Sequence, residues 1–103
     1  MQVDNSQNCP IIKANTILGD KWNLLIFKNL LSGNKRFCQL QSLIPEISSR
    51  TLTIKLKNLA GEKLINRKQF PEIPARVEYS LTEKGIHLKK VITEIEKFGQ
   101  KYL

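Results

Sequence analysis

The sequence predicts a mostly helical α+β domain in which four helices precede a two-stranded hairpin and a long final helix. Three observations support this fold class. Apolar residues recur every three or four positions through most of residues 10–61, which is the period of an amphipathic helix. Residues 76–81 alternate between apolar and polar side chains, as in a half-buried strand. An apolar stripe at helical spacing then continues to the end of the chain.

Length and charge narrow the classes of protein to which the chain can belong. Its 103 residues can bury one core, so we expect a single domain over residues 9–103, preceded by an N-terminal arm of residues 1–8. The 17 Lys and Arg residues outnumber the 9 Asp and Glu residues, and the net charge of +8 favours nucleic acid over an anionic membrane surface as partner. The sequence has neither a membrane-spanning apolar run nor a secretory signal, so we expect a cytoplasmic protein with no membrane partner.

Two helices are predicted before residue 32. Pro10 suits the first position of a helix, where its missing N–H would have no partner, and Gly19 ends that helix. Asp20 can cap a second helix over residues 21–31, which is apolar on nearly every side and is therefore expected at the centre of the core.

Two further helices flank a tight turn at Pro45, which ends the first of them because the residue before a proline is disfavoured in the α region. The second is expected over about residues 48–61, with Ser48 as its N-cap. Its leucines, from Leu52 to Leu59, share one narrow stripe, and the opposite side carries cationic and hydroxyl groups. The helix before the turn should have an inner face of four apolar residues: Phe37, Leu40, Leu43 and Ile44.

A hairpin and a long helix complete the chain. Two strand-like runs within about residues 64–81 enclose a loop that Pro71 and Pro74 stiffen. Thr82 caps a final helix over about residues 82–103, whose apolar stripe is longer than a small core needs. This order predicts a winged helix-turn-helix with a two-stranded wing. Its recognition helix can enter a major groove of about 12 Å, and its wing can reach the neighbouring minor groove or the backbone.

Five stretches of the chain, within residues 9–99, match the pattern of one family. The most specific is residues 70–82, which read Phe-Pro-Glu-Ile-Pro-Ala-Arg-Val-Glu-Tyr-Ser-Leu-Thr. The other four are Cys9-Pro10, Gly19 to Ile26, Lys35-Arg36-Phe37 and Ile47 to Leu52. On these residues the chain resembles the HxlR-type transcriptional regulators, winged-helix proteins of bacteria related in architecture to MarR-type repressors. The family typically has Gly where Asp20 stands, and often a polar residue where Ile54 stands.

The resemblance implies a homodimer that regulates transcription from pseudo-palindromic operators and is associated with the bacterial nucleoid when bound. Family members pair through their first and last helices, which agrees with the surplus apolar stripe on the final helix and makes it a dimerisation helix. The expected dimer residues are Ile11, Ile12, Leu88, Ile92, Ile95, Phe98 and Tyr102.

Double-stranded DNA is the expected ligand, and two elements supply the candidate contacts. Arg50 is foremost, since its planar fork can hold guanine or phosphate in two bonds; alternatively it forms a surface ion pair with Glu46. Ile54 either touches a thymine methyl group or is an incidental exposed apolar residue. The candidates on the recognition helix are Ser48, Ser49, Arg50, Thr51, Thr53, Ile54 and Lys57. Those in the wing are Lys68, Pro74 and Arg76.

The chain has two cysteines, Cys9 and Cys38, and neither belongs to a metal-ligand pattern. Cys9 lies just before a helix, whose N-terminal end stabilises thiolates. Some HxlR-type regulators, which this chain resembles in its Cys-Pro pair, use that cysteine to sense oxidants or electrophiles. The alternative is an unreactive thiol.

The sequence disfavours two other classes of function. The runner-up is a winged helix that binds another protein, but such a module needs no cationic face like that of Arg50 and Lys57. An enzyme is excluded because the sequence has no paired carboxylates, metal set, phosphate loop or nucleophile–base pair. We therefore expect no catalytic residue, no metal and no cofactor.

Overall fold

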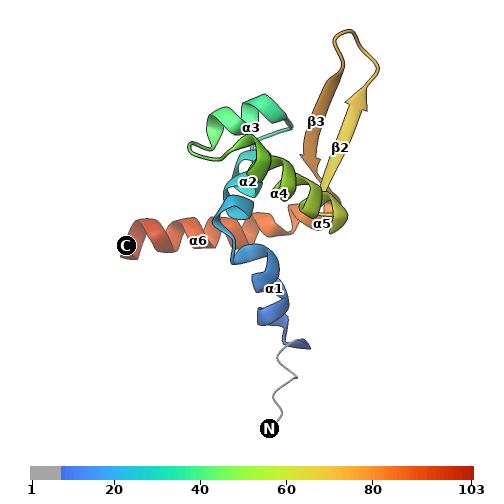
Figure 1. The fold of residues 1–103 in the computed structure, drawn as a ribbon. Helices are drawn as coiled ribbons and strands as arrows, with labels where there is room; N and C mark the ends of the chain where they lie inside the picture. The colour runs from blue at the N-terminus through green and yellow to red at the C-terminus, as the bar shows by residue number, and fades with distance from the viewer. Residues whose placement is uncertain (1–7) are drawn as a thin grey trace.

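The elements follow one another in the order that Figure 1 shows, with the hairpin projecting from the body of the molecule. The computed structural model describes residues 8–103, so the expected N-terminal arm lies outside it except for Asn8. The elements are α1 (Pro10–Leu18), α2 (Lys21–Leu31), β1 (Lys35–Arg36), α3 (Phe37–Leu43), α4 (Ser49–Gly61), β2 (Ile65–Phe70), β3 (Arg76–Leu81), α5 (Glu83–Ile86) and α6 (Leu88–Tyr102). None of these described helices is long and apolar enough to cross a membrane.

Three polar side chains cap helices where the sequence predicts them. The Asp20 carboxylate accepts a hydrogen bond from the backbone N–H of Trp22 at 2.8 Å, at the start of α2. The hydroxyl groups of Ser48 and Thr82 accept from backbone N–H groups three residues ahead, each at 3.0 Å, at the starts of α4 and α5. Each cap satisfies an N–H group that has no partner within its helix, and so defines where that helix begins.

The core is built around α2. Ile26 and Phe27 have no exposed surface, and the leucine stripe of α4, from Leu52 to Leu59, belongs to the same buried cluster. Because α4 buries its leucines in this cluster, its opposite side must face away from the core. The helix α2 is buried on fewer sides than predicted, since Leu25 is partly exposed.

One residue of the predicted inner face of α3 lies outside the core. Leu43 is 49% exposed, whereas Leu40 and Ile44 are almost completely buried. The helix α3 is only seven residues long and ends at Leu43, so its short inner face has room for one turn of buried side chains.

The sheet has three antiparallel strands in the order β1-β3-β2, one more than the sequence predicts. The strands β2 and β3 pair along their whole lengths and form the wing. The short strand β1 pairs Lys35 with Tyr79 and Arg36 with Glu78. Two residues are too few to show a period of two, so no sequence pattern could reveal this strand. The pairing joins the wing to the start of α3.

The final helix, predicted as one element over residues 82–103, is two helices that meet at His87. The first, α5, is held against the start of the wing, because the backbone N–H of Thr82 donates to the carbonyl oxygen of Leu64 at 3.1 Å. A Cβ atom on Gly85 would lie 2.1 Å from that same oxygen, so only glycine allows this approach. The second helix, α6, packs on α2. The α-helical hydrogen bonding is interrupted at His87, between the helix that contacts the wing and the helix that contacts α2.

Two residues expected in a dimer contact also pack within the chain. Ile92 is 4% exposed and belongs to the core, and Leu88 is half-buried against it. Ile92 is covered because this part of α6 lies against α2. The exposed part of the predicted stripe is therefore Ile95, Phe98 and Tyr102.

Candidate nucleic-acid interface

The outer face of α4 presents two cations with no partner in the described part of the chain. Arg50 and Lys57 are exposed about two helical turns apart, and no hydrogen bond or ion pair within residues 8–103 engages either head group. The alternative ion pair between Arg50 and Glu46 is therefore not formed. Ile54 lies on the same face and is 45% exposed. This face can offer donors to phosphate or to base edges on either side of an apolar spot.

The hydroxyl groups at the start of α4 have partners within the chain. Ser48 Oγ donates to Thr51 Oγ1 at 2.9 Å, and Thr53 Oγ1 donates to the backbone oxygen of Ser49 at 2.8 Å. Ser49 Oγ accepts a hydrogen bond of 2.8 Å from the side-chain amide of Gln41 on α3. The bond from Gln41 ties the first turn of α4 to α3, and the other two lie within the start of α4. Each hydroxyl group retains a lone pair or a proton for a ligand.

A groove of about 160 Å³ connects the recognition helix to the wing. Its rim includes Thr53 and Lys57 from α4 and Arg67 from β2, and Tyr79 of β3 lies at its base. The sequence leaves open whether Arg67 is a contact, because the facing of β2 is not readable from its mostly polar sequence. The groove shows that α4 and the wing form one continuous surface.

The wing places Arg76 in a cluster of internal contacts. Its guanidinium lies 4.0 Å from the centre of the Phe70 ring, with Nη2 3.0 Å from Glu72 and Nε 3.6 Å from Glu78. Lys68 Nζ lies 5.0 Å from the same ring and remains exposed. Of the two predicted cationic contacts in the wing, Lys68 therefore faces solvent, whereas the charge of Arg76 is already matched by carboxylates.

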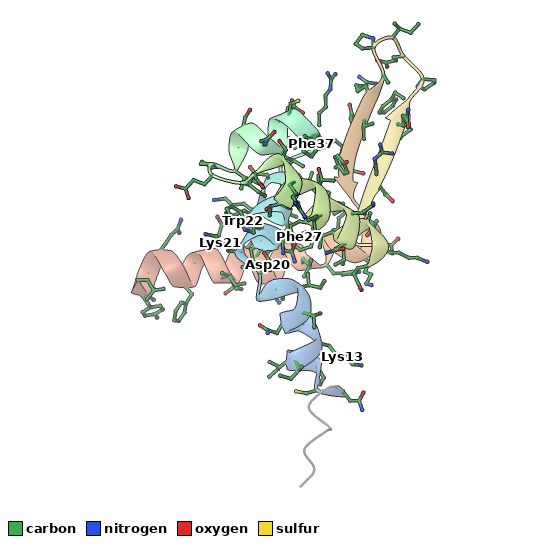
Figure 2. All side chains as sticks on the ribbon, in the orientation of Figure 1. Lys13, Asp20, Lys21, Trp22, Phe27 and Phe37 are labelled. Atoms are coloured by element: carbon green, nitrogen blue, oxygen red, sulfur yellow. The ribbon has the colours of Figure 1, made fainter. Side chains whose placement is uncertain are left out.

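Asp20 links the start of α2 to the recognition helix, a contact that the sequence does not reveal. Besides capping α2, its carboxylate accepts a hydrogen bond from Lys55 Nζ on the inner flank of α4. Figure 2 shows Asp20 where α1 meets α2, beside Lys21 and Trp22. Burial opposes ionisation of Asp20, but the hydrogen bonds from Lys55 and from the backbone of Asn23 and Trp22 outweigh it, so the pKa of Asp20 lies below its ordinary value of 3.8.

Cys9 is the N-cap residue of α1, with Pro10 at the first helical position, as predicted. It is partly buried, whereas Cys38 on α3 is exposed, and both are free thiols. The helix α1 itself buries no residue and projects from the body of the molecule (Figure 1). Among residues 8–103, no three side chains are grouped in a way that could hold a metal ion.

Comparison with known families agrees with this geometry. The family model described as HxlR-like helix-turn-helix matches residues 17–103. The match includes α2, α3, α4, the wing and the final helices. It therefore covers the α4 face and the wing, and it leaves out Cys9 and most of α1.

Individual relatives agree with the family match. The HTH-type transcriptional regulator YdeP of Bacillus subtilis (strain 168) is 37% identical over 99 residues, which are 96% of this chain and 77% of that protein. A crystal structure of a MarR-family transcriptional regulator from Porphyromonas gingivalis W83 has a TM-score of 0.91 and 41% identity, covering 100% of both chains. The redox regulator HypR in its oxidized form has a TM-score of 0.88 and 30% identity, covering 92% of this chain and 98% of that one.

The Asp20–Lys55 pair leads to a prediction about stability. We expect Asp20→Ala to lower the free energy of unfolding by roughly 1–2 kcal/mol at pH 7, because it removes both the cap and a half-buried ion pair. Asp20→Asn keeps a capping oxygen and should cost less than about 1 kcal/mol. Chemical denaturation monitored by circular dichroism measures both changes.

The same pair predicts how stability depends on pH. A carboxyl group with a lowered pKa in the folded state stabilises the protein above its ordinary pKa of 3.8, and this contribution is lost as the pH falls through the lowered value. Wild type should therefore lose stability more steeply below about pH 4 than Asp20→Asn does. Equal acid profiles, or a double-mutant cycle with Lys55→Met that shows no coupling, would contradict the pairing.

Proposed function

The chain belongs to the HxlR-like helix-turn-helix family of transcriptional regulators, and on that premise we propose that it binds a specific DNA sequence as a homodimer. As a member of this family the chain is a transcriptional regulator and not an enzyme. The observation that carries the proposal is the outer face of α4, where Arg50 and Lys57 have exposed head groups that no partner in the described part of the chain engages. Opposite them, the leucine stripe is fully buried, so this is the face that α4 presents to a ligand.

We assign the DNA contacts to α4 and to the wing. On α4, Arg50 reads a base edge or holds a phosphate, Ile54 meets a thymine methyl group and Lys57 binds the backbone. The hydroxyl groups near the start of α4 supply further phosphate or base contacts: Ser48, Ser49, Thr51 and Thr53. In the wing, Lys68 and Pro74 approach the neighbouring minor groove, and Arg76 holds the wing in the shape that this approach requires.

We propose that two copies pair through α1 and α6. Ile11 and Ile12 on α1 and Ile95, Phe98 and Tyr102 on α6 are large apolar side chains that remain exposed in one chain. Exposed apolar surface gathered on two projecting helices is typical of an interface between subunits. A two-fold dimer would place two α4 helices on a pseudo-palindrome with half-sites about one helical turn, roughly 34 Å, apart. Bound to such operators, the protein would be associated with the nucleoid.

We further propose that Cys9 makes DNA binding responsive to oxidants. Its position at the N-cap of α1 supports this assignment, because α1 is one of the two helices assigned to the dimer contact. The structural relative HypR is described as a redox regulator, which is consistent with a redox role in this fold. A change at Cys9 would act on the arrangement of the two subunits and so on the spacing of their α4 helices.

A winged helix that binds only protein is the alternative, and the α4 face argues against it. A protein-binding module would not need unpaired cations two turns apart on the helix that follows the turn. A gel shift with genomic DNA fragments separates the two functions.

Arg50→Ala tests the assignment of the recognition helix. With a duplex selected by wild type from genomic fragments, we expect specific binding to weaken by roughly 1–3 kcal/mol while binding to random DNA changes less. Fluorescence anisotropy over a range of salt concentrations gives both affinities. Lys90→Ala is the matched control, since it removes one exposed cation from α6.

Two outcomes of that titration would count against the proposal. If each dimer neutralises ~6–10 phosphates, the log–log dependence on salt should have a slope of about −0.9 per phosphate. A salt-insensitive complex, or no duplex binding at low salt, refutes DNA binding. Equal loss of specific and random binding in Arg50→Ala assigns Arg50 to phosphate instead of to a base.

Phe98→Asp tests the dimer. A charge placed among the exposed apolar residues of α6 should dissociate the subunits, because burying an unpaired carboxylate in the interface has a large free-energy cost. Light scattering after size exclusion should give a dimer for wild type and a monomer for the variant. Gln100→Asp adds the same charge at an exposed position nearby on α6 and should remain dimeric. A monomeric wild type would contradict the proposed assembly.

Cys9→Ser tests the response to oxidants. Hydrogen peroxide converts a reactive thiolate to a sulfenic acid, and we expect this treatment to release wild type and Cys38→Ser from DNA but not Cys9→Ser. Anisotropy before and after treatment, followed by reduction, measures the release and its reversal. Identical behaviour of Cys9→Ser and wild type would show that Cys9 is not the sensor.

A further inference from the structure

A polar cavity of about 480 Å³ lies between the junction of α1 with α2 and the C-terminal half of α4. Its walls carry two carboxylates and two ammonium groups, from Asp20, Glu62, Lys55 and Lys57. Asp20 is labelled in Figure 2, where α1 meets α2. Of the DNA contacts assigned above, only Lys57 lines this cavity. A cavity of this volume can hold a small molecule.

Asn23 on α2 lines the cavity and has a hydrogen-bond acceptor that is not used within the chain. The residue is only 6% exposed. Its Nδ2 donates to the backbone oxygen of Ile17 at 3.0 Å, which fixes the orientation of the amide. The other atom of the amide, Oδ1, is buried, and no group within residues 8–103 donates to it. Because native proteins rarely leave a buried acceptor without a donor, this oxygen indicates an N–H or O–H group from a molecule in the cavity.

The charged groups on the walls form one matched pair and one unmatched pair. Lys55 and Asp20 engage each other. Lys57 and Glu62 are exposed, and no ion pair within residues 8–103 engages either of them. The ammonium group of Lys84 donates to the backbone oxygen of Glu62 and not to its carboxylate. The cavity therefore offers a ligand one cation, one carboxylate and one neutral acceptor.

We propose that this cavity binds a free amino acid. The ammonium group of the ligand donates to Asn23 Oδ1 and to the carboxylate of Glu62, and the carboxylate of the ligand accepts from Lys57 Nζ. An ammonium group has three N–H donors and no acceptor, which suits two acceptors on one wall. A zwitterion matches both unmatched charges, whereas a simple anion or cation would leave one of them without a partner.

The inference deepens the proposed function, because Lys57 belongs to both sites. Lys57 also lines the groove between α4 and the wing, so its head group lies between the cavity and the proposed DNA surface. An ammonium group that holds the carboxylate of the ligand is not available to a phosphate. A bound amino acid should therefore weaken DNA binding. Only this effect on DNA rests on the proposed function, since the cavity and its walls do not depend on it.

Calorimetric titration of the full chain with each standard amino acid, in the absence of DNA, tests the site directly. We expect one amino acid, or a few of similar size, to bind wild type. Glu62→Gln and Lys57→Met should each weaken that binding on the order of ten-fold, because each removes a hydrogen bond to a charged group. Glu83→Gln is the matched control, since it removes an exposed carboxylate outside the cavity and should bind like wild type.

The contact with Asn23 can be followed without a substitution that risks the fold. In proton–nitrogen NMR spectra, the side-chain amide of Asn23 should shift when the amino acid binds. The amide of Asn29, which donates to the backbone oxygen of Leu25 and lies outside the cavity, should not. The N-acetylated and the amidated forms of the same amino acid should bind at least ten-fold more weakly. The site is refuted if wild type binds no amino acid, or if both blocked forms bind as well as the parent.

Fluorescence anisotropy with a duplex selected by wild type tests the link to DNA. A saturating concentration of the amino acid should lower the affinity for DNA and reduce the magnitude of the salt slope by about 0.9 per subunit, as one phosphate contact is lost. An unchanged DNA affinity with the amino acid bound would overturn the competition for Lys57. If wild type binds an amino acid but no duplex at low salt, the proposed function fails and the site stands. If wild type binds DNA but no amino acid, only the site fails.

Discussion

The carboxylate of Asp20 is the contact on which the position of the recognition helix depends. It starts α2 by accepting backbone N–H groups, and it holds α4 through Lys55. The helix α2 is the centre of the core, so any group tied to its first turn is tied to the most rigid part of the molecule. One acidic side chain thus sets both where α2 begins and how α4 lies against it.

The leucine stripe and Lys55 together determine which side of α4 faces outward. The stripe from Leu52 to Leu59 prevents rotation of α4 about its axis, because any rotation would expose buried apolar surface. Lys55 adds a directional bond on the flank next to the stripe. With these two constraints satisfied, Arg50 and Lys57 can point only to solvent, and their unpaired state follows from the packing of the core.

Sequence patterns predicted the parts of this structure that depend on local rules. Three caps and the period of the α4 leucines need only neighbouring residues, and all are present where expected. The missed features depend on residues far apart in the chain. Strand β1 exists only because β3 lies beside it, and the close approach of Leu64 to Gly85 joins residues 21 positions apart. The bounds of the recognition helix agree with the prediction to within one residue. The ion pairs of Lys55 and Arg76 could not be predicted, because the sequence does not show which side chains the fold brings together.

These ion pairs reduce the number of basic residues that are available to a ligand. Residues 50–76 hold seven of the 17 basic residues, which by itself suggests an evenly basic surface from α4 to the wing. In the folded chain Lys55 is matched by Asp20, and Arg76 by two glutamates, so neither is available to a polyanion. Within residues 8–103, the cations of this stretch that form no ion pair lie on α4, in the turn after it and along β2. If the chain binds DNA as proposed, the phosphate backbone therefore meets the cations of α4 and β2, and Lys55 and Arg76 serve to hold the two elements in place.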